Sequence, residues 1–202
     1  MPEQLNKIIR RKFRIKDDDT LPFVNHHRRR TRKDIASLFN ALGYKVGAEI
    51  GVHRGRFAKI LFDNIHGLKL YCVDPWVAYE SIRPVPQEKV DREYAKCLSR
   101  LNGLNVQYLK MTSMEAINII PDNSLDFVYI DGLHEFNDVI MDIICWSNKV
   151  REGGIVSGRN YFPFYRSGAM IAVDAYTHAN NINEWYVVTA DTYPSYFWVK
   201  GA

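Results

Sequence analysis

Short apolar runs alternate with longer amphipathic segments along most of this chain, and the alternation limits its fold more than any other feature. The longer segments repeat apolar residues at helical spacing, as Phe136, Val139 and Ile143 do. The runs short enough to be strands are residues 46–50, 68–73, 105–111, 125–130 and 155–157. Strands that alternate with helices need crossover connections, so the pattern predicts an α/β fold whose parallel sheet is covered by helices on both faces.

Capping signals mark where two of these helices begin. Thr31 and Asp34 form a capping-box pattern before a helical segment that Gly43 ends. Thr112 and Glu115 repeat the pattern before a shorter segment. Both spacings predict helices that start just after a threonine.

The last third of the chain departs from the strand-and-helix alternation. Residues 168–180 predict one more helix. Residues 185–189 and 196–199 then flank a turn at Pro194, as the two strands of a β-hairpin do. This hairpin would add an antiparallel edge to the parallel sheet.

Composition is that of one globular domain. The chain has 202 residues, of which 47% are hydrophobic and 25% are charged, which excludes the disordered and fibrous classes. No apolar run approaches the ~18 residues of a membrane span, and no secretory pattern follows Met1, so we expect a cytoplasmic protein. Cys72, Cys97 and Cys145 are far apart and odd in number, which predicts buried, reduced thiols rather than disulfides or a zinc site.

Positive charge is concentrated at the amino end. Residues 1–33 hold 11 Lys and Arg against 4 Asp and Glu, with a basic cluster at residues 26–33. We therefore divide the chain into a basic N-terminal arm, residues 1–30, and a domain, residues 31–202. Such an arm is either solvated or bound to an anionic partner.

Polar and glycine residues follow four of the predicted strands. These loops contain residues 49–55, 74–76, 112–115 and 131–134. In a parallel sheet the carboxyl ends of the strands meet at one edge, where ligands bind. The four loops therefore predict one binding site.

The first of these loops does not suit a dinucleotide. Gly47, Gly51 and Gly55 are spaced by four instead of following the G-x-G-x-x-G pattern, which disfavours a nicotinamide oxidoreductase. Glu49 would also repel a pyrophosphate. Asp74 lies 23 residues beyond Gly51, close to the position of an acid that binds ribose hydroxyls. A nucleoside that carries an ammonium and a sulfonium, as S-adenosylmethionine does, fits these acids better.

Several segments resemble the successive motifs of one enzyme family. The segments are GAEIGVHRGRFA, YCVDPW, MTSMEA, LDFVYIDGLHEFNDVIMDI and VREGGIVSGRNY. They are similar to class I S-adenosylmethionine-dependent methyltransferases, in particular to a small bacterial group placed with sugar and macrolide O-methyltransferases. The resemblance runs from about Gly43 to the end. It implies a single Rossmann-like, doubly wound sheet of order 3-2-1-4-5-7-6, mostly parallel with an antiparallel strand from the C-terminal hairpin.

The resemblance also implies which residues bind the cofactor. They are Glu49, Gly51, Val52, Gly55, Phe57, Asp74, Pro75, Trp76, Ser113, Met114 and Asp131. Asp74 would hold the ribose, Trp76 and Met114 would flank the adenine, and Asp131 would face the amino group or the reacting hydroxyl. Plainer roles stay open: Gly51 and Gly55 as packing glycines, and Trp76 as part of the rim.

Three basic residues follow the first glycine loop. His53, Arg54 and Arg56 stand at a helix N-terminus, where cations oppose the helix dipole. A nearby anion would offset this, either the methionine carboxylate or an acidic acceptor. A solvated cluster is the alternative.

Catalysis of methyl transfer to a hydroxyl needs a group that takes its proton. Asp131 and His134 are the titratable pair of the fourth loop, and a histidine is the better base near neutral pH. His134 could instead be only a helix-start residue. Arg159, Asn160 and Tyr161 would contact a small polar acceptor such as a sugar or glycan unit.

Metal dependence is not expected. Metal-binding relatives carry acidic residues where this chain has Arg159 and Asn160, and hard cations prefer anionic oxygen ligands. The competing functions are an RNA methyltransferase and an RNA-binding module, each using the basic arm. The acceptor and the oligomeric state are not determined by the sequence.

Overall fold

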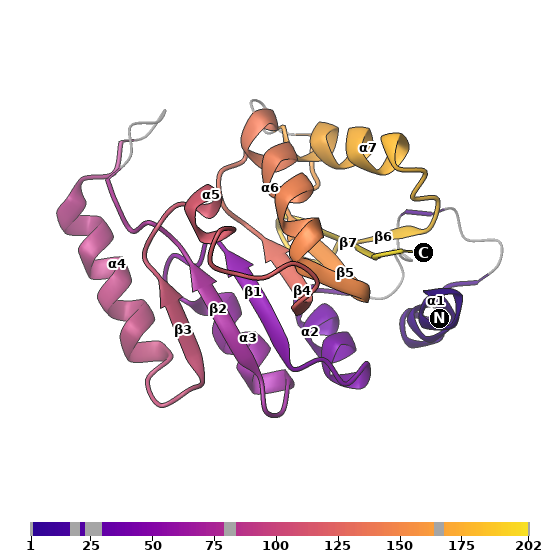
Figure 1. The fold of residues 1–202 in the computed structure, drawn as a ribbon, viewed down its shortest axis with the longest axis horizontal. Helices are drawn as coiled ribbons and strands as arrows, with labels where there is room; N and C mark the ends of the chain where they lie inside the picture. Colours follow the sequence, from indigo (N-terminus) through magenta and orange to yellow (C-terminus); the bar gives the residue numbers. More distant parts are fainter. Residues whose placement is uncertain (1, 17–20, 23–29, 79–83, 164–167, 202) are drawn as a thin grey trace.

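A seven-stranded sheet forms the centre of the protein, in a computed structural model that describes residues 2–16, 21–22, 30–78, 84–163 and 168–201 (Figure 1). The strand order is β3-β2-β1-β4-β5-β7-β6. The strands are β1 (Val46–Ile50), β2 (Lys69–Val73), β3 (Val106–Leu109), β4 (Leu125–Ile130), β5 (Val150–Arg159), β6 (Trp185–Val188) and β7 (Ser195–Val199). Strands β1 to β5 pair in parallel, and β7 is antiparallel to both β5 and β6. The expected α/β fold and strand order are confirmed.

Helices cover both faces of this sheet (Figure 1). They are α1 (Pro2–Phe13), α2 (Arg32–Ala41), α3 (Arg56–Asn64), α4 (Gln87–Arg100), α5 (Ser113–Ala116), α6 (Phe136–Lys149) and α7 (Ala169–Ala179). Alternate residues of β4 point to opposite faces: Phe127 and Tyr129 join one core cluster with α1 to α4, and Val128 and Ile130 join another with α5 to α7. The sheet is therefore doubly wound, as expected.

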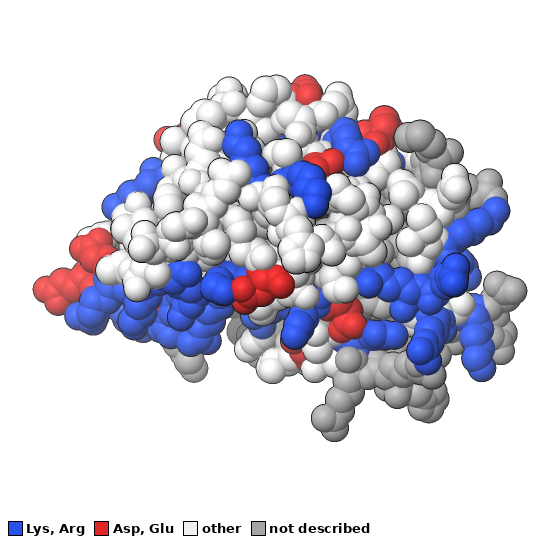
Figure 2. Space-filling view, turned by 90° about the horizontal axis from the view of Figure 1, so that it is seen from below, with Lys and Arg blue, Asp and Glu red and all other residues white. Residues whose placement is uncertain are grey.

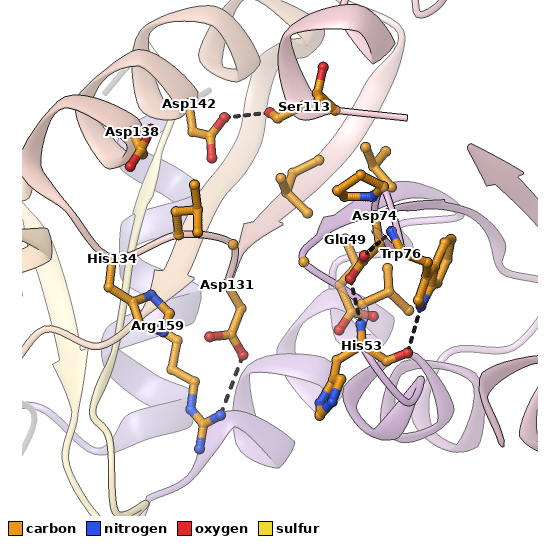
Figure 3. Close-up of a pocket in the computed structure, with 18 of the residues that line it drawn as sticks. Glu49, His53, Asp74, Trp76, Ser113, Asp131, His134, Asp138, Asp142 and Arg159 are labelled. Carbon is orange, nitrogen blue, oxygen red and sulfur yellow. Dashed lines mark hydrogen bonds and ion pairs between the residues drawn. The ribbon is translucent and has the colours of Figure 1, made fainter. Parts of the chain in front are cut away.

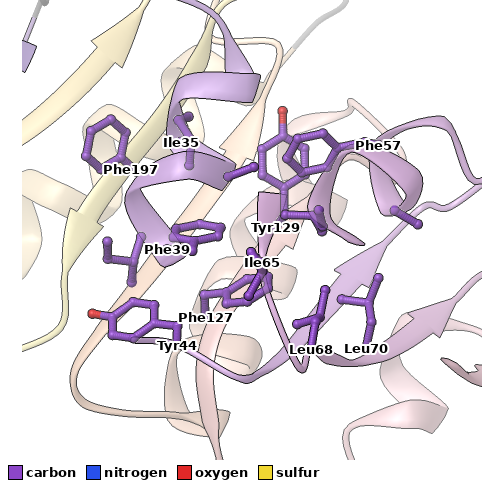
Figure 4. Close-up of a cluster of buried hydrophobic side chains, with 14 of the residues drawn as sticks. Ile35, Phe39, Tyr44, Phe57, Ile65, Leu68, Leu70, Phe127, Tyr129 and Phe197 are labelled. Atoms are coloured by element: carbon purple, nitrogen blue, oxygen red, sulfur yellow. The ribbon is translucent and has the colours of Figure 1, made fainter. Parts of the chain in front are cut away.

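Aromatic packing ties α2 and α3 to the centre of the sheet (Figure 4). Phe39 of α2 stacks on Phe127, with 4.2 Å between ring centroids, and Phe57 of α3 lies 3.9 Å from Tyr129. Gly47 makes room for this packing, because a Cβ there would lie 2.2 Å from the Phe127 ring. These contacts fix where α2 and α3 begin, at the carboxyl edge of the sheet.

Both predicted capping boxes are present. The side chain of Thr31 accepts from the backbone N–H of Lys33, and Asp34 Oδ2 accepts from the backbone N–H of Thr31 at 2.9 Å. Thr112 and Glu115 form the same reciprocal pair before α5. The expected helix at residues 168–180 and the hairpin around Pro194 also appear, as α7 and the β6–β7 pair.

The first helix differs from the expected arm. Residues 2–13 form α1, in which Ile9 and Phe13 are fully buried and join the core. Phe13 lies 5.5 Å from the Phe197 ring, and Arg10 pairs with Glu184 at 2.6 Å. The sequence analysis assigned these residues to the arm and did not predict α1. Most residues of α1 are charged or polar, so its two buried apolar residues, Ile9 and Phe13, give only a weak helical pattern in the sequence.

Lys and Arg side chains gather on the side of the molecule that carries the amino ends of the strands (Figure 2). Exposed members on α1 and just after it are Lys7, Arg11, Arg14 and Lys16. The basic residues 26–29 lie outside the described residues. Contact between this end of the chain and an anionic partner stays a prediction.

The thiols behave as the composition suggests. Cys72 and Cys97 are buried, Cys145 is partly buried, and all three are free. No helix in the described part of the chain is long and apolar enough to cross a membrane.

Substitution of a buried α1 residue tests whether α1 belongs to the domain. We expect Phe13→Ala to lower the free energy of unfolding by about 3–5 kcal/mol, because it removes a buried ring and leaves a cavity. Ile8→Ala is the control, since Ile8 is 41% exposed on the same helix. Denaturant unfolding of both variants measures the difference. Equal, small losses would show that α1 contributes little to the core.

Candidate active site

A cavity of about 1130 Å³ opens at the carboxyl ends of β1, β2 and β4 (Figure 3). All four predicted loops contribute to it. The expected site residues that line it are Glu49, Gly51, Val52, Phe57, Asp74, Pro75, Trp76, Ser113, Met114, Asp131, His134 and Arg159. Asp131, His134 and Arg159 lie on one side, and Glu49 and Asp74 lie on the other (Figure 3).

Gly51 brings the ends of β1 and β4 together. It has a φ of +83°, and a Cβ at this position would lie 2.2 Å from the carbonyl oxygen of Asp131. The backbone N–H of Asp131 donates to the oxygen of Ile50 at 2.7 Å across the same junction. Only glycine tolerates this approach, so Gly51 sets the floor of the cavity.

Asp74 is held by the backbone on both sides of its carboxylate. Its Oδ2 accepts from the N–H of His53, and its Oδ1 accepts from the N–H of Trp76, each at 2.8 Å. A carboxylate oxygen can accept more than one hydrogen bond. Asp74 can therefore still accept from two hydroxyls of a ligand, one on each oxygen.

Glu49 is a carboxyl group buried beside the cavity, with 2% of the residue exposed. It accepts a backbone hydrogen bond from Ala58, but its Oε2 is buried without a hydrogen-bond partner. Burial raises its pKa well above the usual range, and the charge of Asp131 adds to this, while Arg32 opposes it. Oε2 is thus a buried acceptor that suits a cationic donor.

Asp131 lies between two arginines. Its Oδ2 is 3.4 Å from Nη1 of Arg159 and 3.9 Å from Nη1 of Arg32. Burial raises the pKa of Asp131 to about 6, against the lowering effect of both guanidinium groups. The desolvation of this carboxylate therefore outweighs its ion pairs.

His134 is fixed by its neighbour across the rim. Nδ2 of Asn160 lies 2.9 Å from its Nδ1 and 2.8 Å from its Nε2, and its carbonyl oxygen accepts from Gly168 at 2.7 Å. Burial lowers the pKa of the imidazole. A neutral imidazole has one nitrogen lone pair and the amide nitrogen of Asn160 can only donate to it, so His134 can accept a proton where this contact opens.

Ser113 is oriented by α6. Its hydroxyl bonds to Asp142 and accepts from Nε1 of Trp146 at 2.7 Å. Burial raises the pKa of Asp142, which also lines the cavity, to about 6. The sequence analysis missed Asp142. An acid among the apolar residues Val139 and Ile143 of one helix is the signal that could have identified it.

Trp76 lines the cavity and is held by contacts within the protein, whereas Gly55 packs away from the cavity. Trp76 is only 2% exposed; its Nε1 donates to the oxygen of His53 at 2.9 Å and its ring packs on Tyr94 at 4.5 Å. Gly55 does not line the cavity; it begins α3 with a φ of +65°, and a Cβ there would lie 3.0 Å from Sγ of Cys97 on α4. Gly55 is a packing glycine.

The anion for the basic residues at the start of α3 comes from the protein. Arg54 donates to both carboxylate oxygens of Glu93 on α4, and His53 Nε2 lies 4.0 Å from the same group. The sequence analysis did not include Glu93. Its pairing with Arg54 leaves that arginine satisfied without a ligand.

The three expected acceptor residues separate in the structure. Arg159 lines the cavity, with its guanidinium 5.2 Å from the Tyr193 ring, whereas Asn160 lies behind it against His134. Tyr161 lies outside the cavity, where its hydroxyl donates to Asp174 at 2.8 Å. This placement differs from the acceptor contact expected of Tyr161. Among the described residues, no three His, Cys, Asp or Glu side chains gather as metal ligands would.

Arg32 is a further pocket residue that the sequence analysis overlooked. It lines the cavity from the first position of α2 and approaches the same oxygen of Asp131 as Arg159 does. In the sequence it is one of several neighbouring arginines. Arg32 differs from the neighbouring arginines only in the folded protein, where α2 packs on β4 and its first residue lines the cavity.

The raised pKa of Asp131 predicts a pH-dependent stability difference. Between about pH 4 and 6, Asp131 is ionised in the unfolded chain but still protonated in the folded protein. The free energy of unfolding of the wild type therefore falls as the pH rises through this range. Asp131→Asn does not titrate. We expect the unfolding free energy of the variant, relative to wild type, to rise by up to about 3 kcal/mol over this range and then to level off.

Thermal or denaturant unfolding at several pH values measures this difference. Asp63→Asn removes one exposed carboxylate from α3 and serves as the control. If the difference in unfolding free energy between wild type and Asp131→Asn does not change with pH, the pKa of Asp131 is not raised by burial.

Several solved structures with the same fold are described as O-methyltransferases, and one is described as a spermidine synthase. An O-methyltransferase from Bacillus cereus, in complex with SAH, matches with a TM-score of 0.62 and 13% identity over 99% of this chain and 92% of that one. The O-methyltransferase NovP matches with a TM-score of 0.61 and 16% identity over 85% and 80% of the two chains. A structure described as a putative caffeoyl-CoA O-methyltransferase from Staphylococcus aureus matches with a TM-score of 0.61 and 14% identity, over 97% of this chain and 91% of that one. At these identities the likeness shows the fold.

Sequence comparison identifies the family. No curated protein sequence matches the chain. The family model described as "Methyltransferase domain" matches residues 48–161, which run from within β1 through the cavity loops to just beyond β5. This match covers more than half of the 202 residues. The chain therefore belongs to the methyltransferase-domain family.

Proposed function

We propose that this methyltransferase transfers a methyl group from S-adenosylmethionine to a hydroxyl group of a small polar acceptor, such as a sugar or glycan unit. The observation that carries the proposal is the pair of carboxyl groups, those of Asp74 and Glu49, on one side of the cavity. Asp74 is oriented by two backbone N–H groups, and Glu49 has a buried oxygen without a partner. Together they suit a ligand with adjacent hydroxyls at one end and an ammonium at the other.

The residues present fit this cofactor. Asp74 would accept hydrogen bonds from the ribose hydroxyls, and Glu49 and Asp131 would accept from the ammonium. Ser113, Met114 and Asp142 line the end of the cavity beyond Asp74, where the adenine would lie. When bound, S-adenosylmethionine supplies a methyl group already activated by a sulfonium. The protein then has mainly to align the acceptor.

His134 would take the proton of the acceptor hydroxyl. It lines the cavity beside Asp131, and the contact with Asn160 holds its ring in place. Arg159, on the same side of the cavity, would contact the acceptor. The O-methyltransferases among the structural neighbours support a hydroxyl acceptor. The alternative of an RNA acceptor gains no support from them.

The proposed reaction does not depend on a divalent metal ion. Nη1 of Arg159 lies 3.4 Å from the carboxylate oxygen of Asp131. A guanidinium at that distance repels a second cation and already occupies a lone pair of the Asp131 carboxylate.

Asp74→Ala tests the cofactor site. We expect the affinity for S-adenosylhomocysteine, measured by calorimetry, to fall about 10- to 100-fold, because hydrogen bonds to a charged group are lost. Asp63→Ala, on the exposed face of α3, should leave it unchanged. Equal affinity in the Asp74 variant would remove this residue from the site, and failure of the wild type to bind would refute the proposed cofactor.

His134→Ala tests the proposed base. We expect turnover with an accepted hydroxyl substrate to fall by about 10²–10⁴ while the affinity for S-adenosylhomocysteine stays within about twofold, because the imidazole acts on the acceptor. His66→Ala, outside the cavity, is the control. If His134 only starts α6, the variant would keep near-normal turnover and lose about 1 kcal/mol of stability.

A further inference from the structure

Arg32 is a largely buried cation that three parts of the chain hold against the cavity. Its side chain is 18% exposed, and its guanidinium lies 5.1 Å from the centre of the Phe57 ring on α3. Its backbone N–H donates to Oδ2 of Asp191, from the β6–β7 loop, at 2.7 Å. The capping box of Thr31 fixes the preceding residue. The side chain is thus pre-organised.

Among the described residues, two guanidinium groups face one carboxylate at this end of the cavity. Arg32 and Arg159 both face Asp131, at 3.9 Å and 3.4 Å, and Nε of Arg159 is buried without a hydrogen-bond partner. Both guanidinium groups thus face the single Oδ2 atom of Asp131, which cannot pair with all of their N–H groups, and one more anion would complete the arrangement.

An amino acid carries an ammonium, which suits Glu49 and Asp131, and a carboxylate, which suits the two arginines. Its ammonium and carboxylate are attached to the same carbon, so a carboxylate must lie beside whatever binds the ammonium. Glu49 and Asp131 attract the ammonium but repel the carboxylate. Arg32 is the arginine whose charge acts on both of these acids, whereas that of Arg159 acts on Asp131 and His134 but not on Glu49.

The other arginine that could bind the carboxylate is already paired. Arg54 donates to both oxygens of Glu93. Arg56 is exposed to solvent, where an ion pair contributes little. The start of α3 adds its own positive potential close to Arg32, because Phe57 is the second residue of that helix.

We propose that Arg32 binds the carboxylate of the methionine part of the cofactor, through the fork of its guanidinium group. The role rests on the proposed cofactor site. It places a cofactor-binding residue before residues 48–161, the range that the family model matches. A planar guanidinium suits this task because it can donate two parallel hydrogen bonds to a carboxylate.

Two ligands separate this role from a structural one. S-adenosylhomocysteine carries both the ammonium and the carboxylate, whereas its decarboxylated analogue, S-adenosyl-3-thiopropylamine, carries only the ammonium. Calorimetry measures the affinity of each for the wild type, Arg32→Gln and Lys33→Gln. Lys33 is the matched control, since it is the exposed next residue of α2 and lies outside the cavity.

We expect Arg32→Gln to weaken S-adenosylhomocysteine about 10- to 100-fold. The decarboxylated analogue should bind the same variant equally well or more tightly, because loss of the cation leaves Asp131 more attractive to an ammonium. Lys33→Gln should change neither affinity. Arg32→Lys should recover part of the loss, since it restores the charge without the fork.

Three results would overturn the proposal. An equal loss for both ligands in Arg32→Gln would show that Arg32 acts by holding the fold or Asp131. An unchanged affinity for S-adenosylhomocysteine would show that Arg32 makes no contact with it. Failure of the wild type to bind S-adenosylhomocysteine would refute the proposed cofactor site itself, which distinguishes that failure from the other two.

Discussion

The close approach of β1 and β4 at Gly51 is the constraint on which the rest of the site depends. A Cβ at Gly51 would lie 2.2 Å from the carbonyl oxygen of Asp131, so any other residue would push the two strand ends apart. With the ends together, Glu49 and Asp131 face the same space, and β2 brings Asp74 alongside. One missing methyl group thus allows three acids from three strands to act on one ligand.

Three buried acids of the cavity, Glu49, Asp131 and Asp142, explain why it suits a cation. Burial raises the pKa of Glu49 well above its usual range and those of Asp131 and Asp142 to about 6. Each group is therefore costly to ionise in the folded protein, and a positively charged ligand offsets part of that cost. Because a ligand that binds only the folded state stabilises it, the same electrostatics should couple cofactor binding to stability.

The sequence was sufficient to predict the fold and the acidic residues that follow the strands. It was insufficient to predict site residues whose position depends on tertiary contacts. Asp74 and Asp131 were predictable because strand ends in a parallel sheet share one edge. Gly55 was assigned to the site from its neighbours in the motif, yet a motif does not say which side of a turn faces the ligand. Arg32 and Glu93 could not be found, because each acts on a loop distant in sequence.

The two ends of the proposed cofactor site depend on different parts of the molecule. Asp74 follows β2 and is oriented by the loop after β1, inside the family match. Arg32 instead starts the helix that Arg30 connects to α1: the Arg30 guanidinium lies 5.7 Å from the Phe13 ring and pairs with Asp34 at 2.9 Å. Asp191 fixes the same helix start from the C-terminal hairpin. The N-terminal helix, though distant from the cavity, therefore helps to position the cation that we assign to the methionine carboxylate, and loosening it should weaken that end of the site before the ribose end.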